Sequence, residues 1–135
     1  MKPTLVAGLT VTRAVPVDRE RTIAFMGEGA RVYATPMLVR DIEVACRQLL
    51  LAHLDSGEDS VGTRIELDHM AATLLGMTAS LTVAVTEVKG RAVSFAIEGS
   101  DGVDAICRGT HKRFVVDLAQ TKSRLAAKAA KAGIA

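Results

Sequence analysis

Residues 33–50 read YATPMLVRDIEVACRQLL, and this stretch decides the fold because it predicts one long, largely apolar helix. Thr35 and Pro36 open it, since a threonine can cap the first turn and a proline at the first helical position loses no hydrogen bond. Apolar residues occupy nearly every side of the helix, which we expect to run to about Leu54. Such a helix has to be wrapped by other parts of the chain.

One residue departs from the apolar character of this helix. Glu43 lies beside Cys46 and Leu50 on the predicted helical surface. One interpretation is an ordinary exposed ion pair with Arg40 or Arg47, three and four positions away. The other is that the carboxylate is kept for chemistry, because a carboxylate among apolar neighbours needs a partner or its pKa rises.

The rest of the chain predicts an antiparallel sheet. Alternating or β-branched patterns indicate strands, and Lys-Gly and Asp-Gly pairs indicate tight turns between the later ones. We expect strands at 4–15, 60–69, 77–88, 91–98 and 103–116, and a helical tail over 117–135. One domain, 1–135, follows: an α+β fold whose antiparallel sheet wraps around a long central helix. Its open sheet edge favours pairing with a second copy, so we expect a homodimer.

The connection between the first strand and the helix is longer than usual. Residues 16–31, PVDRERTIAFMGEGAR, mix charges and glycines with a short apolar island, which predicts a loop with one helical turn. Loops of that length in compact domains are often lids or binding loops. The first strand and this loop together make up residues 1–31, and Phe25 is the aromatic residue of the loop.

Composition limits the classes of function. Aromatic residues are 3% of the chain and the formal net charge is +2, which argues against a nucleic-acid-binding surface. The sequence contains neither a membrane-span-length apolar run nor a signal peptide, so we expect a cytoplasmic protein without a membrane partner. Cys46 and Cys107 both lie in apolar patterns and are read as buried free thiols. There is no metal-ligand spacing, and no metal or cofactor is expected.

Polar residues on apolar faces are the candidates for chemistry. On the strand over 60–69, alternation places His69 on the face of Val61 and Ile65, toward the helix, and Gly62 on the other face. A lone histidine there is more often a structural residue than a catalytic one. Jointly, however, Thr35, Glu43 and His69 make an acid–base constellation that we expect to converge on one hollow.

Four segments carry a resemblance to a known family. The sequence resembles the fluoroacetyl-CoA thioesterase-like family of hotdog-fold proteins from about Val32 to Val116. The similar segments are VYATPMLVRDIEVAC (32–46), SVGTRIELDHMAAT (60–73), GMTASLTVAVTEVKGR (76–91) and DGVDAICRGTHKRFVVD (101–117).

The resemblance implies roles for individual residues. Thr35, Glu43 and His69 match the family's catalytic threonine, glutamate and histidine. Gly62 matches a glycine whose backbone lies near the substrate carbonyl, and Arg113 matches an arginine close to the active site. Phe25 is expected to contact substrate from the lid. The lid is shorter and less aromatic than in the family member selective for fluoroacetyl groups, so a different small acyl chain is expected.

These expectations lead to an acyl-CoA thioesterase that hydrolyses a small acyl thioester, with CoA as part of the substrate. Glu43 would activate water or attack the carbonyl directly, and the sequence leaves both open. A non-catalytic hotdog module that binds an acyl thioester or a small apolar ligand is the alternative. A hydratase is the third reading, but it needs an Asp/His pair, and Asp68 and His69 are strand neighbours that face opposite ways.

Overall fold

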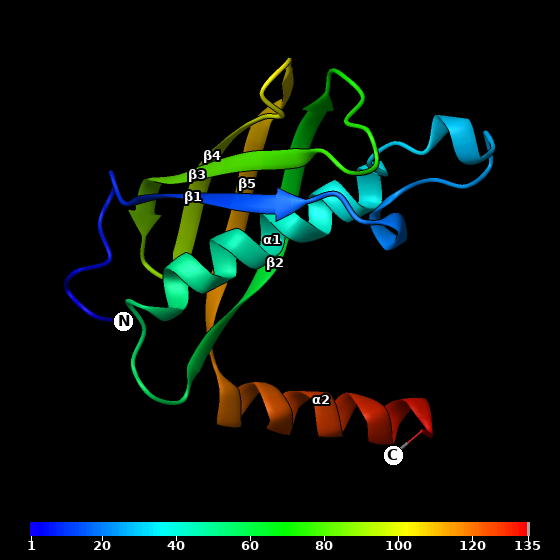
Figure 1. Cartoon of the computed structure of the whole chain (residues 1–135). Coiled ribbons are helices and arrows are strands. Elements are labelled where there is room, and N and C mark those ends of the chain that lie inside the picture. The colour runs from blue at the N-terminus through cyan, green and yellow to red at the C-terminus, as the bar shows by residue number, and fades with distance from the viewer. Residues whose placement is uncertain (135) are drawn as a thin grey trace.

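Five antiparallel strands form one sheet, and a single long helix lies across one of its faces (Figure 1). The computed structural model describes residues 1–134. The strands are β1 (Thr10–Pro16), β2 (Glu58–His69), β3 (Thr78–Lys89), β4 (Ala92–Ser100) and β5 (Ala105–Asp117). Their order across the sheet is β1-β3-β4-β5-β2, so β2 and β1 are its edges. The predicted fold class, an antiparallel sheet around a central helix, is confirmed.

The core lies between the central helix α1 (Thr35–Leu51) and the inner face of the sheet. Leu38, Ile42 and Leu50 of α1 are fully buried. Along each strand, alternate residues point toward the helix and pack against these side chains. The strand residues buried against the helix are Ala79, Leu81, Val83, Val85, Val93, Phe95, Ile97 and Val115. Cys46 and Cys107 are buried free thiols, as predicted.

Two details of α1 differ from the prediction. The helix ends at Leu51 rather than about Leu54, and Ala34 rather than Thr35 occupies the capping position. The helix is also not wrapped on every side, because the side chains of Val44 and Leu51 are 43% and 37% exposed. The sheet covers one face of α1 and leaves an apolar strip on another.

A β-bulge in β2 changes which residues face the helix. Gly62 pairs with Arg113 of β5 and Arg64 pairs with Lys112, so Thr63 is an extra residue between them. An inserted residue reverses the alternation of a strand at that point. The prediction that Gly62 and His69 lie on opposite faces is therefore wrong, and both face inward.

The connection between β1 and α1 contains two short 3₁₀ turns, η1 (Arg19–Arg21) and η2 (Glu28–Ala30), where the sequence predicted one helical turn. The strand β1 begins at Thr10, later than the predicted residue 4. At the other end of the chain, α2 (Leu118–Ala132) stands apart from the sheet (Figure 1), and none of its residues is buried. Within residues 1–134, no helix is both long and apolar enough to cross a membrane.

Gly109 of β5 gives a direct test of the pairing between β5 and β2. A Cβ atom at position 109 would lie 1.9 Å from the backbone carbonyl oxygen of Glu66, so a side chain there forces the strands apart. We expect Gly109→Ala to lower the free energy of unfolding by about 3 kcal/mol, the upper range for overpacking. Urea denaturation measures the change. Gly29→Ala, where nothing lies within 4 Å of the added atom, is the matched control; equal stabilities of the two variants would contradict the register.

Candidate active site

Thr35 and His69 form a hydrogen-bonded pair at the start of α1. The Thr35 hydroxyl lies 2.8 Å from Nδ1 of His69, which is the last residue of β2. The threonine hydroxyl therefore bonds an imidazole across the fold instead of capping its own helix. Two residues that are 34 positions apart in the chain thus make the hydroxyl–imidazole contact typical of nucleophilic and acid–base sites.

The pair opens onto a hollow of about 330 Å³ between α1 and the lid loop. Phe25 lines this hollow and is 83% exposed, so its ring stands at the mouth rather than in the core. The remaining lining residues are Ile23, Val32, Tyr33, Ala34, Met70, Ala71 and Ala72. This volume, at the lower end of the range for ligand pockets, suits a small group in an apolar setting.

The imidazole of His69 has one nitrogen without a partner. Nε2 is buried and, among residues 1–134, is the one buried side-chain nitrogen or oxygen that has no hydrogen-bond partner. Burial lowers the pKa of His69, which favours the neutral ring at neutral pH. A buried polar atom left unpaired is costly, so this nitrogen is a natural place for a ligand or water to bind.

Glu43 lies elsewhere, against the middle of β2 and β5. Its Oε1 is 3.9 Å from Nη1 of Arg113 and 3.9 Å from Nε2 of His111, and its side chain is 44% exposed. These distances are too long for hydrogen bonds. The ion pair with Arg40 or Arg47, one of the two interpretations of Glu43, is not found among residues 1–134, and Arg47 instead binds both carboxylate oxygens of Asp59 at 2.9 and 2.7 Å.

Arg113 is fixed behind Glu43 by three hydrogen bonds. Its Nε donates to the hydroxyl of Ser60 at 2.7 Å, and its Nη2 donates to the backbone carbonyl of Ser60 at 2.8 Å. Its Nη1 donates to Nε2 of His111 at 3.2 Å, because Nδ1 of that ring donates to the carbonyl oxygen of Arg64 at 2.8 Å. These three bonds hold the guanidinium group in place, with its Nη1 on the side of Glu43.

Gly62 is part of this cluster for a steric reason. A Cβ atom at position 62 would lie 2.3 Å from Oε1 of Glu43 and 3.2 Å from the His111 ring. The bulge turns this glycine inward, and the missing side chain provides the space that the carboxylate fills. A side chain at position 62 would therefore push the flexible end of Glu43 out of its present place.

The predicted site residues therefore form two groups in one chain. Thr35, His69 and Phe25 meet at the hollow, whereas Glu43 meets Gly62 and Arg113. Eight residues of helix separate Thr35 from Glu43, a rise of about 12 Å. The expected convergence of Thr35, Glu43 and His69 on one hollow is not found within the chain.

A further buried network ties the lid to α1, and the sequence analysis did not find it. Asp41 is 8% exposed and accepts hydrogen bonds from the Tyr33 hydroxyl and from Arg21 of η1, whose Nε and Nη2 lie 2.9 and 3.2 Å from its oxygens. The Tyr33 ring stands edge-on to His69, with centroids 6.5 Å apart. In the sequence, the spacing of Tyr33 and Asp41 was a possible signal of this network. The third partner, Arg21, lies in a loop without periodicity, so no pattern connects it with the other two.

Other candidates lie outside the site. Burial raises the pKa of Cys46 to about 12 and of Cys107 to about 11, so both remain thiols at neutral pH. Asp68 is exposed and faces away from His69, as expected of strand neighbours. Among residues 1–134, no three histidine, cysteine or acidic residues gather in a way that could hold a metal ion.

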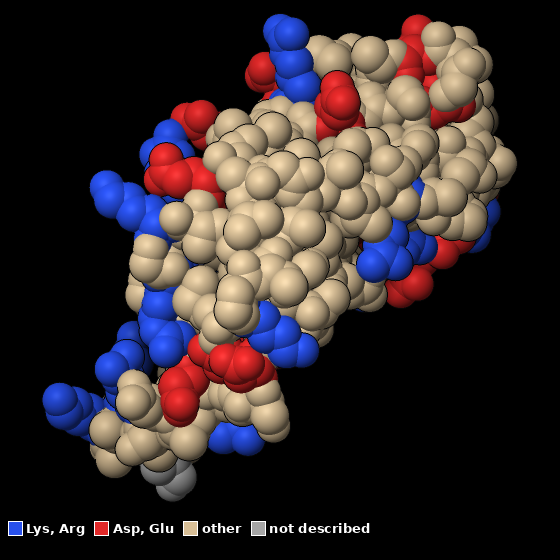
Figure 2. Space-filling view, turned by 90° about the vertical axis from the view of Figure 1, so that its left-hand side faces the viewer, with Lys and Arg blue, Asp and Glu red and all other residues tan. Residues whose placement is uncertain are grey.

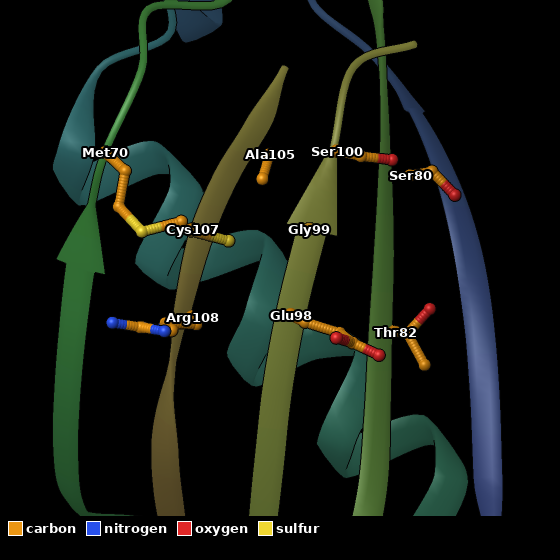
Figure 3. A pocket seen from close by; sticks show the side chains of 9 residues that line it. All are labelled: Met70, Ser80, Thr82, Glu98, Gly99, Ser100, Ala105, Cys107 and Arg108. Carbon is orange, nitrogen blue, oxygen red and sulfur yellow. The ribbon is translucent and has the colours of Figure 1, made fainter. Parts of the chain in front are cut away.

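A second hollow, of about 410 Å³, lies on the side of the sheet away from α1 (Figure 3). Figure 3 shows Thr82, Glu98 and Arg108 pointing outward from neighbouring strands, with α1 behind the sheet. Strand pairing places these three residues side by side. The sheet lies between this hollow and the Thr35–His69 pair, and Met70 lines both this hollow and the one beside the pair.

Solved structures with this arrangement place the chain in the hotdog thioesterase superfamily. A thioesterase superfamily member from Thermus thermophilus superposes with a TM-score of 0.89 at 25% identity, over all of both chains. Residues 17–119 match the profile of the fluoroacetyl-CoA-specific thioesterases. The chain belongs to this family, as its sequence predicted.

Two further relatives are named for the same activity. The fluoroacetyl-CoA thioesterase of Streptantibioticus cattleyicolor is 38% identical over 98 residues, which are 73% of this chain and 70% of that protein. A variant of the fluoroacetyl-CoA-specific thioesterase FlK, solved with fluoroacetate and CoA, has a TM-score of 0.79 at 34% identity and covers 85% of this chain and 98% of its own. Members of the family are thioester hydrolases, and the prediction of that enzyme class is confirmed.

The buried state of His111 predicts how stability depends on pH. Burial, reinforced by the nearby charge of Arg113, lowers the pKa of His111 in the folded protein, although its bond to Arg64 and the charge of Glu43 oppose the shift. The unfolded chain, with a histidine pKa near 6.5, therefore binds more protons than the folded one just below that pH. The stabilisation is complete above about pH 6.5 and is lost as the pH falls from there through the lower pKa of the folded state.

We expect the free energy of unfolding to decrease from about pH 7.5 to about pH 5, and to decrease less in His111→Asn. Asparagine keeps a donor for the Arg64 carbonyl and does not titrate. Urea denaturation across this pH range measures both slopes. Parallel slopes for the two proteins would show that His111 is not the buried neutral group described.

Proposed function

We propose that the chain hydrolyses a small acyl-CoA thioester at a site completed by two copies, with Thr35 and His69 from one copy and Glu43, Gly62 and Arg113 from the other. The observation that carries the proposal is the Thr35–His69 hydrogen bond in a hollow where Nε2 of His69 has no partner among residues 1–134. The acyl group would enter this hollow, beside the imidazole.

The edge strand β2 supports a two-fold arrangement. In the described chain, β2 has a neighbour on one side only, β5, so its other edge is free to pair. Long free edges are usually covered, and a two-fold axis lets the same edge pair with itself. Val44 and Leu51 are exposed apolar side chains on α1. Such a dimer would cover more of this helix.

The same symmetry brings the two groups of residues together. Gly62 and His69 lie seven residues apart on β2, roughly 23 Å along the strand, so one copy cannot join them. When two β2 strands pair antiparallel about Glu66, residues of the same face lie opposite each other, and the bulged Gly62 and Thr63 of each copy lie level with the partner's His69. The bulge matters here, because it turns Gly62 toward Glu43, on the face of β2 that carries the imidazole.

The chemistry follows from the charges at the joined site. A thioester carbonyl develops negative charge on oxygen when it is attacked, and preorganised donors stabilise that charge. The Gly62 amide and the Thr35 amide at the start of α1 are the donors that we assign to this oxygen, since Met37 and Leu38 donate to the Ala34 carbonyl and Pro36 has no N–H. Neutral His69 exchanges the proton through Nε2, and Thr35, bonded to Nδ1, orients the ring.

Glu43 has two possible parts in this reaction. Its carboxylate, 3.9 Å from Arg113, can take a proton from water that attacks the carbonyl, or it can attack the carbonyl itself. In both routes the carbon–sulfur bond breaks, the CoA thiolate gains a proton, and water supplies the oxygen of the released acid. The shared outcome is one free acid and one CoA thiol for each water consumed.

The lid bears on which acyl group is taken. Phe25 is the exposed ring at the mouth of the hollow, and the Arg21–Asp41–Tyr33 network anchors the loop that carries it. We propose that Phe25 contacts the substrate. A hollow of about 330 Å³ with an apolar lining favours a short acyl chain, and we make no claim for a fluorinated one.

The first test removes each half of the site. Glu43→Gln and His69→Ala should each lower kcat by about 10²–10⁴-fold, the range for an acid–base group. Release of free thiol from acyl-CoA esters of increasing chain length measures the rate. Glu98→Gln, an exposed glutamate on the outer face, is the control and should keep the parent rate.

Mixing the two inactive variants tests whether the site is shared. In a heterodimer of Glu43→Gln and His69→Ala, one of the two sites has both groups intact. Random exchange of subunits should restore about a quarter of the wild-type activity, since half of the dimers then carry one working site. No recovery after exchange, shown to occur by mass spectrometry, would contradict a shared site. Tight acyl-CoA binding by wild type without turnover would favour a non-catalytic binding module instead.

A second prediction concerns the space at Gly62. Gly62→Ala should displace the Glu43 carboxylate, because its Cβ would lie 2.3 Å from Oε1, and kcat should fall by at least about tenfold. Adding Glu43→Asp, which shortens the side chain by one methylene, should recover part of this loss if crowding is the cause. Glu43→Asp alone should be slower than wild type. A Gly62→Ala enzyme with the parent kcat would refute the steric role of this glycine.

A further inference from the structure

Tyr33, to which the proposed reaction gives no part, lies directly against the imidazole of His69. The two rings meet edge to face, with centroids 6.5 Å apart and planes at 82°, a favourable geometry for ring pairs. Tyr33 lines the hollow and is 2% exposed. Thr35, two residues further along the chain, binds Nδ1 of the same imidazole. The segment 33–35 therefore contacts the imidazole twice, once through a ring and once through a hydroxyl.

The position of Tyr33 is fixed at both ends of the residue. Its backbone N–H donates to the carbonyl oxygen of Thr73 at 2.8 Å. At the far end of the ring, its hydroxyl donates to the carboxylate of Asp41 on α1. Burial and the bond to Asp41 raise the pKa of Tyr33, so the hydroxyl keeps its proton and remains a donor at neutral pH. Asp41 thus decides where the ring of Tyr33 lies.

Arg21 connects this arrangement to the lid. Its Nε and Nη2 lie 2.9 and 3.2 Å from the two oxygens of Asp41. Its backbone carbonyl also accepts a hydrogen bond from the N–H of Ala34 at 2.8 Å. One lid residue therefore holds the segment 33–35 directly through the backbone and indirectly through the partner of the Tyr33 hydroxyl.

The setting of Arg21 differs from that of the basic residues of α2. Figure 2 shows Lys and Arg along the projecting lower-left part of the molecule, which α2 forms, and no residue of that helix is buried. The side chain of Arg21 is 26% exposed and that of Asp41 is 8% exposed. A carboxylate buried to this degree is costly without a paired cation. The Asp41 carboxylate therefore keeps its place, and its bond to Tyr33, only while the lid supplies Arg21.

We propose that Tyr33 is a positioning residue for the His69 imidazole, and that the Arg21–Asp41 ion pair makes this positioning depend on the lid. With the lid in place, Asp41 holds the hydroxyl of Tyr33, and the Tyr33 ring keeps the imidazole beside Thr35. Without Arg21 the carboxylate turns toward water, and the ring and the imidazole gain room to move. The inference rests on the proposed function only for its effect on rate, because the state of the imidazole is measured separately.

Arg21→Gln tests the coupling by removing the cation that the lid supplies. We expect kcat to fall about tenfold for the acyl-CoA ester that wild type hydrolyses fastest, less than the roughly 10²-fold that a displacement of 1 Å can cost. Tyr33→Phe keeps the ring and removes the hydroxyl. It should lower kcat to a similar extent with little change in KM, because the hydroxyl faces Asp41 and not the hollow.

Arg19→Gln is the matched control. Arg19 lies two residues earlier in the same lid and binds both carboxylate oxygens of Glu28, another lid residue, at 2.7 and 2.8 Å. The two side chains of that pair are 61% and 66% exposed, and exposed pairs contribute little. Arg19→Gln should therefore keep the parent kcat and KM. Equal losses in Arg19→Gln and Arg21→Gln would overturn the inference, because the loss would then follow from any change of charge in the lid.

Asp41→Asn distinguishes one coupled network from separate packing effects. Asparagine keeps the size of the side chain and an acceptor for the Tyr33 hydroxyl, and it removes the charge that binds Arg21. If both residues act through their shared contact, the double variant Arg21→Gln/Asp41→Asn should be no slower than the slower single variant. Losses of kcat that multiply in the double variant would contradict the coupling. All rates are measured well below the Tm of each variant, so that unfolding does not contribute to them.

An NMR titration of His69 measures its state without relying on catalysis. Burial lowers the pKa of His69. The titratable groups beside its ring are Tyr33 and, opposite it on β5, Cys107, both uncharged at neutral pH, and in the proposed dimer the partner's Glu43. An imidazole that gains contact with water should titrate closer to the ordinary histidine value of about 6.5. The chain has three histidines, so His69→Ala assigns the signal.

We expect the pKa of His69 to rise in Arg21→Gln and Tyr33→Phe, and to stay at the wild-type value in Arg19→Gln. The Overhauser contact between the ring protons of Tyr33 and His69 should weaken in Arg21→Gln. A slower Arg21→Gln enzyme whose His69 titrates as in wild type would overturn the inference, because its loss would arise elsewhere in the lid. If wild type hydrolyses no thioester, the proposed function fails, and the titration still supports or overturns the positioning by Tyr33.

Discussion

The burial of one face of α1 against the inner face of the sheet is the interaction on which the rest of the structure depends. Leu38, Ile42 and Leu50 are fully enclosed there, and each buried side chain of this size contributes about 2 kcal/mol. Because the helix is fixed along its whole length, its two residues of the candidate site are fixed too. Thr35 is held at the end of β2, and Glu43 is held at the middle of β2 and β5.

The bulge at Thr63 is the second constraint, and it shapes the candidate site rather than the core. One extra residue in β2 turns Gly62 inward, where it leaves space for Glu43, while His69 keeps its inward position further along the strand. Bulges commonly occur beside active sites because they redirect a strand without ending it. Here the redirected residue is a glycine, so the space it leaves is filled by a carboxylate.

The polar groups in and around the candidate site fall into two sets, those with hydrogen-bond partners and those without. The Arg21–Asp41–Tyr33 network and the Ser60–Arg113–His111 network are closely satisfied, which holds the lid and the guanidinium in place. Nε2 of His69 and the carboxylate of Glu43 are not satisfied in this way. Rigid, paired groups thus surround the two groups to which we assign the proposed chemistry.

The sequence by itself determined the order of the elements, the long central helix, the antiparallel sheet, the buried thiols and, through family resemblance, the family. These follow from local periodicity and turn residues, which act over a few positions. The tertiary structure decided that Thr35 bonds His69 rather than capping its helix, that Gly62 faces inward, and that Glu43 lies against Gly62 and Arg113. Contacts between distant segments set these features, and a single inserted residue in a strand reverses a pattern of period two without leaving a mark that alternation can detect.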